Sequence, residues 1–180
     1  MALAFNVDGF TSVIAARGLA SPNKFIVKIT NPTSVGADPE LDIMCETISF
    51  AGRNVQTIMD LQYGLRREIA YNAPVYTPIT LGFLCTDAYR EKDYFDKWNN
   101  FIVDSNKGFD VAYYKHYTGT MTVTTLDRNG KKSNEMEYQD VYPKSVNSIE
   151  LNHSTQNSVA RVSVEMMYSQ WKTLRGVPKR

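Results

Sequence analysis

The two histidines and two cysteines are the residues best suited to metal binding or nucleophilic chemistry, and they are scattered along the chain. Neither His116 nor His153 has a Cys, Asp or Glu partner at a metal-ligand spacing such as C-x-x-C or H-E-x-x-H. Cys45 and Cys85 lie in apolar, strand-like runs, which favours buried free thiols over a disulfide or a reactive site. The sequence also lacks a glycine-rich phosphate loop and a G-x-S-x-G elbow. We therefore predict no metal, no cofactor and no enzymatic activity.

Two pairs of carboxylates are spaced closely enough to be considered for acid/base catalysis. Asp38 and Glu40 fall in a predicted loop. Glu135 and Glu137 alternate along a predicted strand, where carboxylates usually face solvent. We interpret both pairs as surface residues rather than as an active site.

Nucleic-acid binding is the second kind of chemistry that the residue types could support. Arg66 and Arg67 are adjacent on a predicted strand and so point to opposite faces. Lys131 and Lys132 solvate a predicted hairpin turn. With 20 basic and 19 acidic residues, the net charge of +1 gives no bulk attraction to nucleic acid or to an anionic membrane.

A cluster of aromatic residues could stack on bases, but alternating aromatic residues also fill the cores of sheets. Its members are Tyr113, Tyr114, His116 and Tyr117. We favour a role in the core or at a subunit interface over base stacking.

The pattern of apolar residues predicts a mainly β protein. The 180 residues are 43% hydrophobic, which is sufficient for one domain. Strands are predicted at 24–30, 41–50, 65–71, 75–84, 110–117, 120–126, 135–142, 146–151 and 159–168. Asn129-Gly130 predicts a hairpin turn. Pro78 indicates an edge strand or a bulge, and Pro143 is predicted to end its strand. We predict two packed antiparallel sheets that form a β-barrel-like subunit with one flanking α-helix.

The single predicted helix begins at Thr86-Asp87, which can cap its N-terminus, and runs to about residue 104. Aromatic and aliphatic residues recur at helical spacing along it. We predict that Phe95, Trp98 and Ile102 hold this helix against the sheet.

The segment 51–64 is long for a connection between neighbouring strands, and such loops usually have a function. It carries four large apolar or aromatic side chains: Ile58, Met59, Leu61 and Tyr63. Exposed apolar residues and open strand edges need a partner to cover them, so the sequence favours an assembly subunit. An enzyme would instead need a cleft with a pair of titratable side chains. A barrel that binds a small ligand would need an apolar interior. No stretch approaches the roughly 20 apolar residues of a membrane span, so no membrane anchor is expected.

Three segments resemble the tail tube proteins of contractile-tailed bacteriophages. The first is SPNKFIVKI at 21–29, which follows a segment that is helical in that family. The second comprises YQDVYP at 138–143 and VSVEMMYSQW at 162–171, which resemble the family's aromatic-proline turn and closing strand. The third is the aromatic helix around Phe95 and Trp98, which lies where the family has its single helix.

The resemblance implies a structural subunit that assembles six to a ring, with rings stacked into a tube inside a contractile sheath. Its partners would be the sheath, baseplate and tail terminator proteins, with the tape measure protein and DNA in the lumen. Its location would be the virion tail, after assembly in the host cytoplasm. The family's fold is also that of type VI secretion tubes, injection machines and baseplate tube initiators, so these roles are alternatives to a phage tail tube. A non-enzymatic β-barrel that binds a ligand or nucleic acid is a further alternative.

On this interpretation the chain is a single domain, 1–180, with an N-terminal arm at 1–22, a ring-stacking loop at 51–64 and a C-terminal tail at 172–180. A channel lined by basic residues would trap DNA, because each contacted phosphate adds affinity. We therefore expect a neutral to acidic lumen, with Glu135, Glu137 and Asp140 as candidate contributors.

Overall fold

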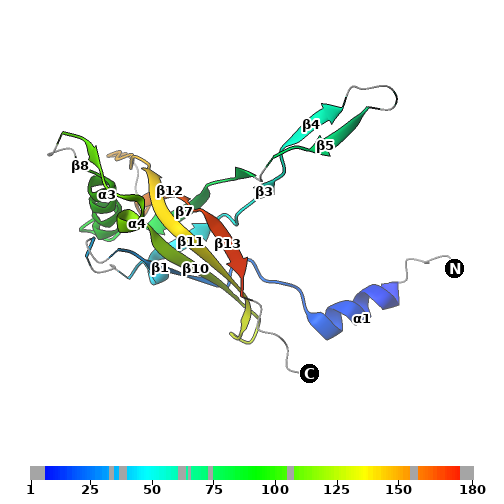
Figure 1. Ribbon diagram of the computed structural model, residues 1–180. Coiled ribbons are helices and arrows are strands. Elements are labelled where there is room, and N and C mark those ends of the chain that lie inside the picture. Colours follow the sequence, from blue (N-terminus) through cyan, green and yellow to red (C-terminus); the bar gives the residue numbers. More distant parts are fainter. Residues whose placement is uncertain are drawn as a thin grey trace.

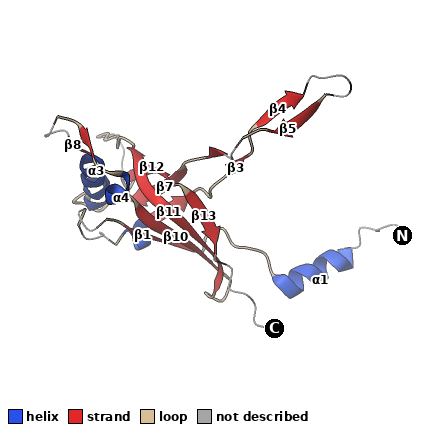
Figure 2. Ribbon diagram, viewed as in Figure 1, coloured by secondary structure: helices blue, strands red, loops and turns tan. Residues whose placement is uncertain are grey.

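A seven-stranded antiparallel sheet dominates the computed structural model (Figures 1 and 2). The structure describes residues 7–32, 35–36, 40–60, 64, 66–72, 75–104, 108–154 and 158–174, with the backbone alone for residues 8, 16 and 17. The strand order is β1-β10-β11-β12-β7-β2, and β13 also pairs with β11. These strands are β1 (Phe25–Thr30), β2 (Cys45–Ile48), β7 (Ile79–Leu84), β10 (Gly119–Leu126), β11 (Lys132–Val146), β12 (Arg161–Met167) and β13 (Gln170–Thr173).

The long strand β11 belongs to two halves of this sheet. Its first part pairs with β10 on one side and β13 on the other, and its last residues pair with β12. Between them Asp140 is a bulge, because Gln139 pairs with Thr120 and Val141 pairs with Gly119. Asp140 has a positive φ of 53°. We call β1, β10, the first part of β11 and β13 the first half-sheet, and the rest of β11 with β12, β7 and β2 the second half-sheet.

Both half-sheets contribute to one hydrophobic core. The bulge changes which residues of β11 face inward, since Tyr138 and Val141 are both fully buried although they are three positions apart. Side chains from β1, β7, β10 and β12 complete the core: Val27, Ile29, Ile79, Leu81, Phe83, Met121, Val123, Val162, Val164 and Met166. The mainly β, antiparallel fold predicted from the sequence is confirmed. Among the described residues β1 and β2 are not paired, so the sheet does not close into a barrel.

Helix α3 (Arg90–Ile102) packs against this core. Phe95 and Trp98 are fully buried, and Ile102 is half-buried against the core residues. The ring of Phe95 lies 5.2 Å from that of Phe83 on β7. The helix begins at Arg90 rather than at Thr86-Asp87, because the Glu91 carboxylate accepts hydrogen bonds from the N–H and Oγ1 of Thr86, at 3.0 and 3.1 Å. Thr86 therefore lies in the turn before the helix.

Shorter elements surround the sheet. They are α1 (Val7–Arg17), α2 (Leu41–Met44), β3 (Arg53–Asn54), β4 (Thr57–Asp60), β5 (Arg67–Ala70), β6 (Val75–Tyr76), β8 (Val103–Asp104), β9 (Asp110–Val111) and α4 (Tyr114–Tyr117). β3 pairs with β6, β4 with β5, and β8 with β9. Among the described helices, none is long and apolar enough to cross a membrane.

Several predicted strand boundaries are wrong. The strand predicted at 41–50 begins as the one-turn helix α2, which buries Leu41 and leaves Ile43 exposed. The strand predicted at 110–117 is instead β9 followed by α4. The strand at 75–84 is interrupted at Pro78, because proline has no N–H for a ladder, and so forms β6 and β7. The strand predicted at 146–151 ends at Val146, as the last residue of β11.

Pro143 does not end its strand, contrary to the sequence prediction. It lies within β11, paired with Met166, and the register shifts between Pro143 and Ser145. A bulge allows a residue without an N–H to remain in the strand. The predicted hairpin at Asn129-Gly130 does join β10 to β11, and Gly130 has the positive φ, 74°, that this turn requires.

Candidate assembly surfaces

The first half-sheet has an open edge along β13. The N–H of Leu174 donates to the carbonyl oxygen of Glu135 at 2.7 Å. Because hydrogen-bonding direction alternates along an antiparallel strand, the N–H of the preceding Thr173 points away from β11. No described strand pairs with this side of β13. An exposed row of backbone donors and acceptors is a template for pairing with another chain.

The opposite margin of the first half-sheet is β1. The carbonyl oxygen of Lys24 accepts a hydrogen bond from the N–H of Leu126 at 2.9 Å, so Phe25 and Val27 direct their backbone groups away from β10. Helix α2 lies beside β1, and among the described residues no strand pairs with its outer side. The half-sheet therefore offers one strand edge at each margin.

A two-stranded ribbon projects from the body (Figure 1). It consists of the β3–β6 pair at its base and the β4–β5 hairpin beyond it. Arg67 Nε lies 3.0 Å from Asp60 Oδ2, which joins β5 to β4. At the base, the Arg53 guanidinium lies 5.7 Å from the centre of the Tyr76 ring and 5.4 Å from that of Trp171. The contact with Tyr76 lies within the β3–β6 pair, and the contact with Trp171 on β13 joins the base of the ribbon to the body.

The ribbon carries the apolar residues that the sequence assigned to a stacking loop. Ile58 and Met59 lie on β4, with 52% and 51% of their surfaces exposed, and Ile69 opposite Ile58 is also exposed. Leu61 and Tyr63 lie outside the described residues. The segment 51–64 is thus not a simple loop, since it contributes β3 and β4. An isolated hairpin is marginally stable in water, so a partner surface is expected to cover this one.

Helix α4 lies at the end of the molecule away from the ribbon (Figure 1), and aromatic side chains contact one another around it. The rings of Tyr114, Tyr117 and Tyr142 contact one another edge to face, with centroids 5.4 to 6.3 Å apart. Tyr113 is 82% exposed, and Phe109 and Val111 nearby in the chain are exposed as well. The contacts among these rings order α4. The exposed residues at and beside α4 form a surface that we call the aromatic end: Phe109, Val111, Tyr113 and Tyr114.

The three acidic residues predicted to face the lumen occupy two different places. Glu135 and Glu137 alternate with the core residue Tyr138 and lie on the outer face of the first half-sheet. Glu135 Oε1 lies 3.1 Å from Lys132 Nζ, and Glu137 pairs across the strands with Thr122 and Lys172. Asp140 is the bulge residue at the corner between the half-sheets, where its Oδ2 accepts a 2.6 Å hydrogen bond from Ser169 Oγ.

The outer face of the first half-sheet is mostly polar and carries charges of both signs. Threonines and glutamines alternate with inward apolar residues on β1, β10, β11 and β13: Thr30, Thr120, Thr122, Thr124, Gln139 and Gln170. The acidic Glu135 and Glu137 lie among Lys28, Lys132 and Lys172 on this face. Such a surface has no strongly basic track for a nucleic-acid backbone.

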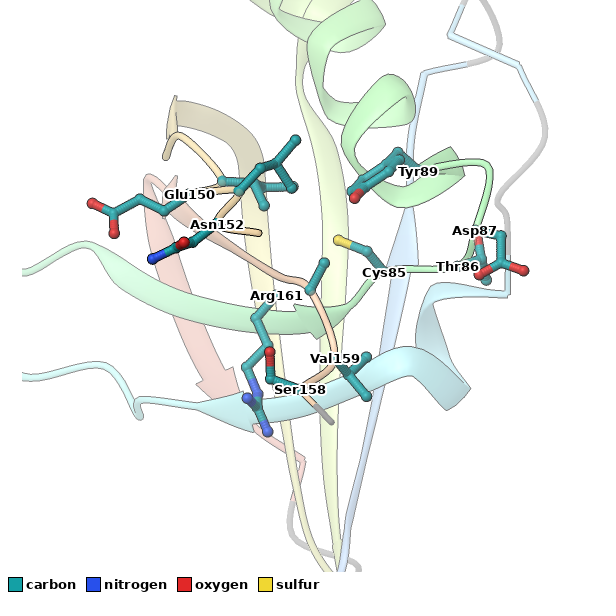
Figure 3. A pocket seen from close by; sticks show the side chains of 12 residues that line it. Cys85, Thr86, Asp87, Tyr89, Glu150, Asn152, Ser158, Val159 and Arg161 are labelled. Atoms are coloured by element: carbon teal, nitrogen blue, oxygen red, sulfur yellow. The ribbon is translucent and has the colours of Figure 1, made fainter. Parts of the chain in front are cut away.

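A pocket of about 510 Å³ lies between the start of α3 and the segments around residues 150 and 160 (Figure 3). Cys85, Tyr89 and Arg161 contribute to its lining. Burial and the nearby Glu91 carboxylate raise the pKa of the Cys85 thiol, so the nucleophilic thiolate is scarce at neutral pH. Within the described residues, no group of three His, Cys, Asp or Glu side chains could hold a metal ion. The pocket thus has neither an activated nucleophile nor a metal site.

A β subunit with an open strand edge and a projecting apolar ribbon has the features of a structural protein that assembles with copies of itself. Comparison of the sequence with protein families matches residues 20–174 to the family described as phage tail tube protein. Because the match covers most of the chain, the protein belongs to the phage tail tube protein family. The resemblance found in the sequence is thereby confirmed. No curated protein sequence matches the chain.

Solved structures of contractile injection systems contain chains with the same fold. A chain of the anti-feeding prophage baseplate is 14% identical, with a TM-score of 0.65 over 87% of this chain and 95% of that one. A chain of the sheath-tube complex of an extracellular contractile injection system in the extended state is 17% identical, with a TM-score of 0.59 over 91% and 96%. A chain of the sheath/tube terminator of that system is 16% identical, with a TM-score of 0.63 over 87% and 97%.

Proposed function

We propose that this protein is the ring-forming subunit of a phage tail tube, with six copies in each ring and the rings stacked around a channel that conducts DNA. The observation that carries the proposal is the pair of strand edges at opposite margins of the first half-sheet. Pairing β13 of one copy with β1 of the next satisfies both edges with a single repeated contact. A repeated head-to-tail contact closes into a ring when its rotation divides evenly into a full turn.

Ring closure in this way makes the first half-sheets of neighbouring copies continuous. Their outer faces then line the channel, which carries Glu135, Glu137 and the threonines of β10. We infer that this lining lets DNA pass without holding it, since Glu135 and Glu137 offset most of the charge of its three lysines and strong phosphate binding requires a large excess of cations. Asp140 would lie at the corner of each subunit, at the margin of this lining.

Stacking of rings requires a second contact between opposite ends of the subunit. The ribbon at one end exposes Ile58, Met59 and Ile69, and the aromatic end on the other side exposes Phe109 and Tyr113. We infer that the ribbon of one ring rests on the aromatic end of the next. This contact repeats without closing, as a tube requires.

The expected partners are the sheath around the tube, the baseplate where it starts, the terminator where it ends, and the tape measure protein inside it. They are consistent with the similar chains in baseplate, sheath-tube and terminator assemblies. A baseplate tube initiator is the second candidate, because a baseplate chain has this fold. An initiator alone would form single rings, whereas a tube subunit would also form long tubes.

Thr173→Pro is expected to abolish rings while leaving the subunit folded. Proline removes the N–H that points to the open edge, whereas the neighbouring ladder bond from Leu174 remains. Negative-stain microscopy and size-exclusion chromatography of the purified protein would measure assembly, and circular dichroism would measure folding.

Thr173→Val is the matched control, because it keeps the N–H and favours a strand. We expect rings and tubes from the parent and from Thr173→Val, and monomers from Thr173→Pro. Normal rings from Thr173→Pro would refute pairing through β13. A parent that remains monomeric at high concentration would refute the tube function itself.

The assembled tube is expected to bind duplex DNA only weakly at physiological salt. Fluorescence anisotropy of a short labelled duplex, titrated with tubes at low and at physiological salt, would measure this. Glu137→Lys is expected to strengthen binding and to make it more dependent on salt, since each added cation can release counterions from a phosphate. Micromolar or tighter binding by the parent that weakens steeply with salt would contradict a passive channel.

A further inference from the structure

Helix α1 stands away from the body of the subunit (Figure 1). Its residues Val7, Phe10 and Val13 are exposed, with 57% of the Phe10 surface accessible. The helix ends at Arg17, and the N–H of the following Gly18, whose φ is 69°, donates to the carbonyl oxygen of Ile14 at 2.7 Å. An isolated helix of 11 residues is marginal in water. Helix α1 therefore requires a surface that covers its apolar side chains.

The part of the chain matched to the phage tail tube family begins at residue 20. Helix α1 lies before this point, so family membership does not assign it a partner. Its binding surface must be sought in the structure of this chain.

An apolar groove of about 590 Å³ lies at the start of β1. Its walls come from the linker after α1, from β1, from the end of β2 and from the β10–β11 hairpin. The apolar residues lining it include Leu19, Pro22, Phe25, Phe50, Leu126 and Met136. Phe50, which follows β2, is 50% exposed there. The groove thus offers an apolar surface against which the exposed apolar side chains of α1 can pack.

The dimensions of the proposed ring allow α1 to reach the groove of the neighbouring subunit. Equivalent β1 strands of adjacent copies are separated by four strand spacings, or about 19 Å. The linker 18–24 extends to at most about 25 Å, and α1 itself is about 16 Å long. The linker forms one wall of its own groove and α1 points away from it, which favours the neighbouring copy over the helix's own subunit.

We propose that α1 of each subunit occupies the apolar groove of the next subunit around the ring, with Phe10 against Phe50. This inference rests on the ring proposed above. The exchanged helix adds an apolar contact to the strand pairing between the same two copies. Each subunit thus inserts its own α1 into one neighbour and binds α1 of the other neighbour. Ring closure and burial of α1 then occur together.

Disulfide trapping between Phe10→Cys and Phe50→Cys tests this arrangement. Equal amounts of the two single variants are mixed as monomers, assembled, oxidised mildly and separated on a non-reducing gel. We expect linked dimers from the mixture and a ladder up to the full ring from the double variant. The native thiols should compete poorly, because burial raises the pKa of Cys45 to about 12 and raises that of Cys85 as well.

Leu151→Cys replaces Phe50→Cys in the matched control, since Leu151 is exposed but lies in a different region of the surface. Two cysteines that docking holds next to each other have a millimolar effective concentration. The pair at positions 10 and 50 should therefore give at least about tenfold more dimer than the control pair. If the double variant forms a disulfide within one subunit and the mixture gives no dimer, α1 occupies the groove of its own subunit. This result would refute the exchange of helices between subunits. Equal dimer yields from both pairs would refute docking altogether. Microscopy of the same samples separates these results from a failure of ring assembly, which would overturn both proposals.

Discussion

Trp98→Ala is expected to lower the free energy of unfolding by about 3 to 5 kcal/mol, which is the usual cost of removing a large aromatic side chain from a core. Trp98 is fully buried on α3, next to Tyr94 and facing the sheet. Its removal would leave a cavity that the surrounding strands can fill only in part. A domain of this size is typically stable by about 5 to 15 kcal/mol, so the loss is a large fraction of the total.

Trp98 also makes a hydrogen bond that its removal would break. Its Nε1 donates to the carbonyl oxygen of Tyr117 at 2.8 Å, which ties α3 to the end of α4. Trp98→Phe keeps most of the apolar volume and loses this bond, leaving the Tyr117 carbonyl without it. A loss of about 1 to 3 kcal/mol is expected for this conservative variant. The difference between the two variants separates packing from hydrogen bonding.

Urea denaturation of monomeric protein would measure both effects, and the Thr173→Pro background would remove the contribution of assembly. Trp171 remains as a fluorescent probe in both variants. An unchanged midpoint for Trp98→Ala would mean that α3 is peripheral to the core.

Local patterns in the sequence predicted the elements that are fixed by short-range chemistry. The Asn129-Gly130 turn needs a residue with positive φ, and Gly130 provides it. The helix α3 was predicted because its apolar residues recur at a period that a strand does not have. The start of the helix was misplaced because Thr86 lies in the preceding turn, where it donates hydrogen bonds to the Glu91 carboxylate, and Tyr89 occupies the N-cap position.

The errors occurred where tertiary structure overrides a local pattern. In the segment 41–44 the apolar residues Leu41 and Ile43 alternate as in a strand, yet only Leu41 is buried. A single helical turn explains this, and alternation over so few residues does not distinguish the two. Pro143 was expected to end a strand, but the register shift beside it lets β11 continue to Val146.

The candidate surfaces depend on contacts that no sequence pattern contains. The exposed apolar residues of 51–64 indicated an interaction surface, but the pairing of Ile58 with Ile69 across β4 and β5 needs the fold. The open edge at Thr173 follows from the register of β13 on β11, and the groove near Phe50 from four separate segments. A C-terminal tail was predicted at 172–180, and a strand after the one predicted at 159–168 was not, whereas β13 extends from Gln170 to Thr173.

Replacement of residues 56–71 by a short glycine-containing turn is expected to abolish tubes while leaving rings intact. The replacement removes β4 and β5 but keeps the β3–β6 pair, so Arg53 can still contact Tyr76 and Trp171. Shortening a connection changes loop-closure entropy only slowly with length, and none of the described residues in the removed segment belongs to the buried core. The midpoint of unfolding should therefore change little.

Stacking should fail because the exposed apolar residues of the ribbon are removed together with the reach of the hairpin. Ile58→Ser with Met59→Ser keeps the hairpin at full length and removes two of its apolar side chains, which separates the two contributions. If apolar contact holds the rings together, the double variant should also give rings without tubes, counted by negative-stain microscopy. If only reach matters, it should assemble as the parent does. Tubes of normal length from the shortened protein would mean that rings stack through other surfaces, and the aromatic end would then need a different partner from the ribbon.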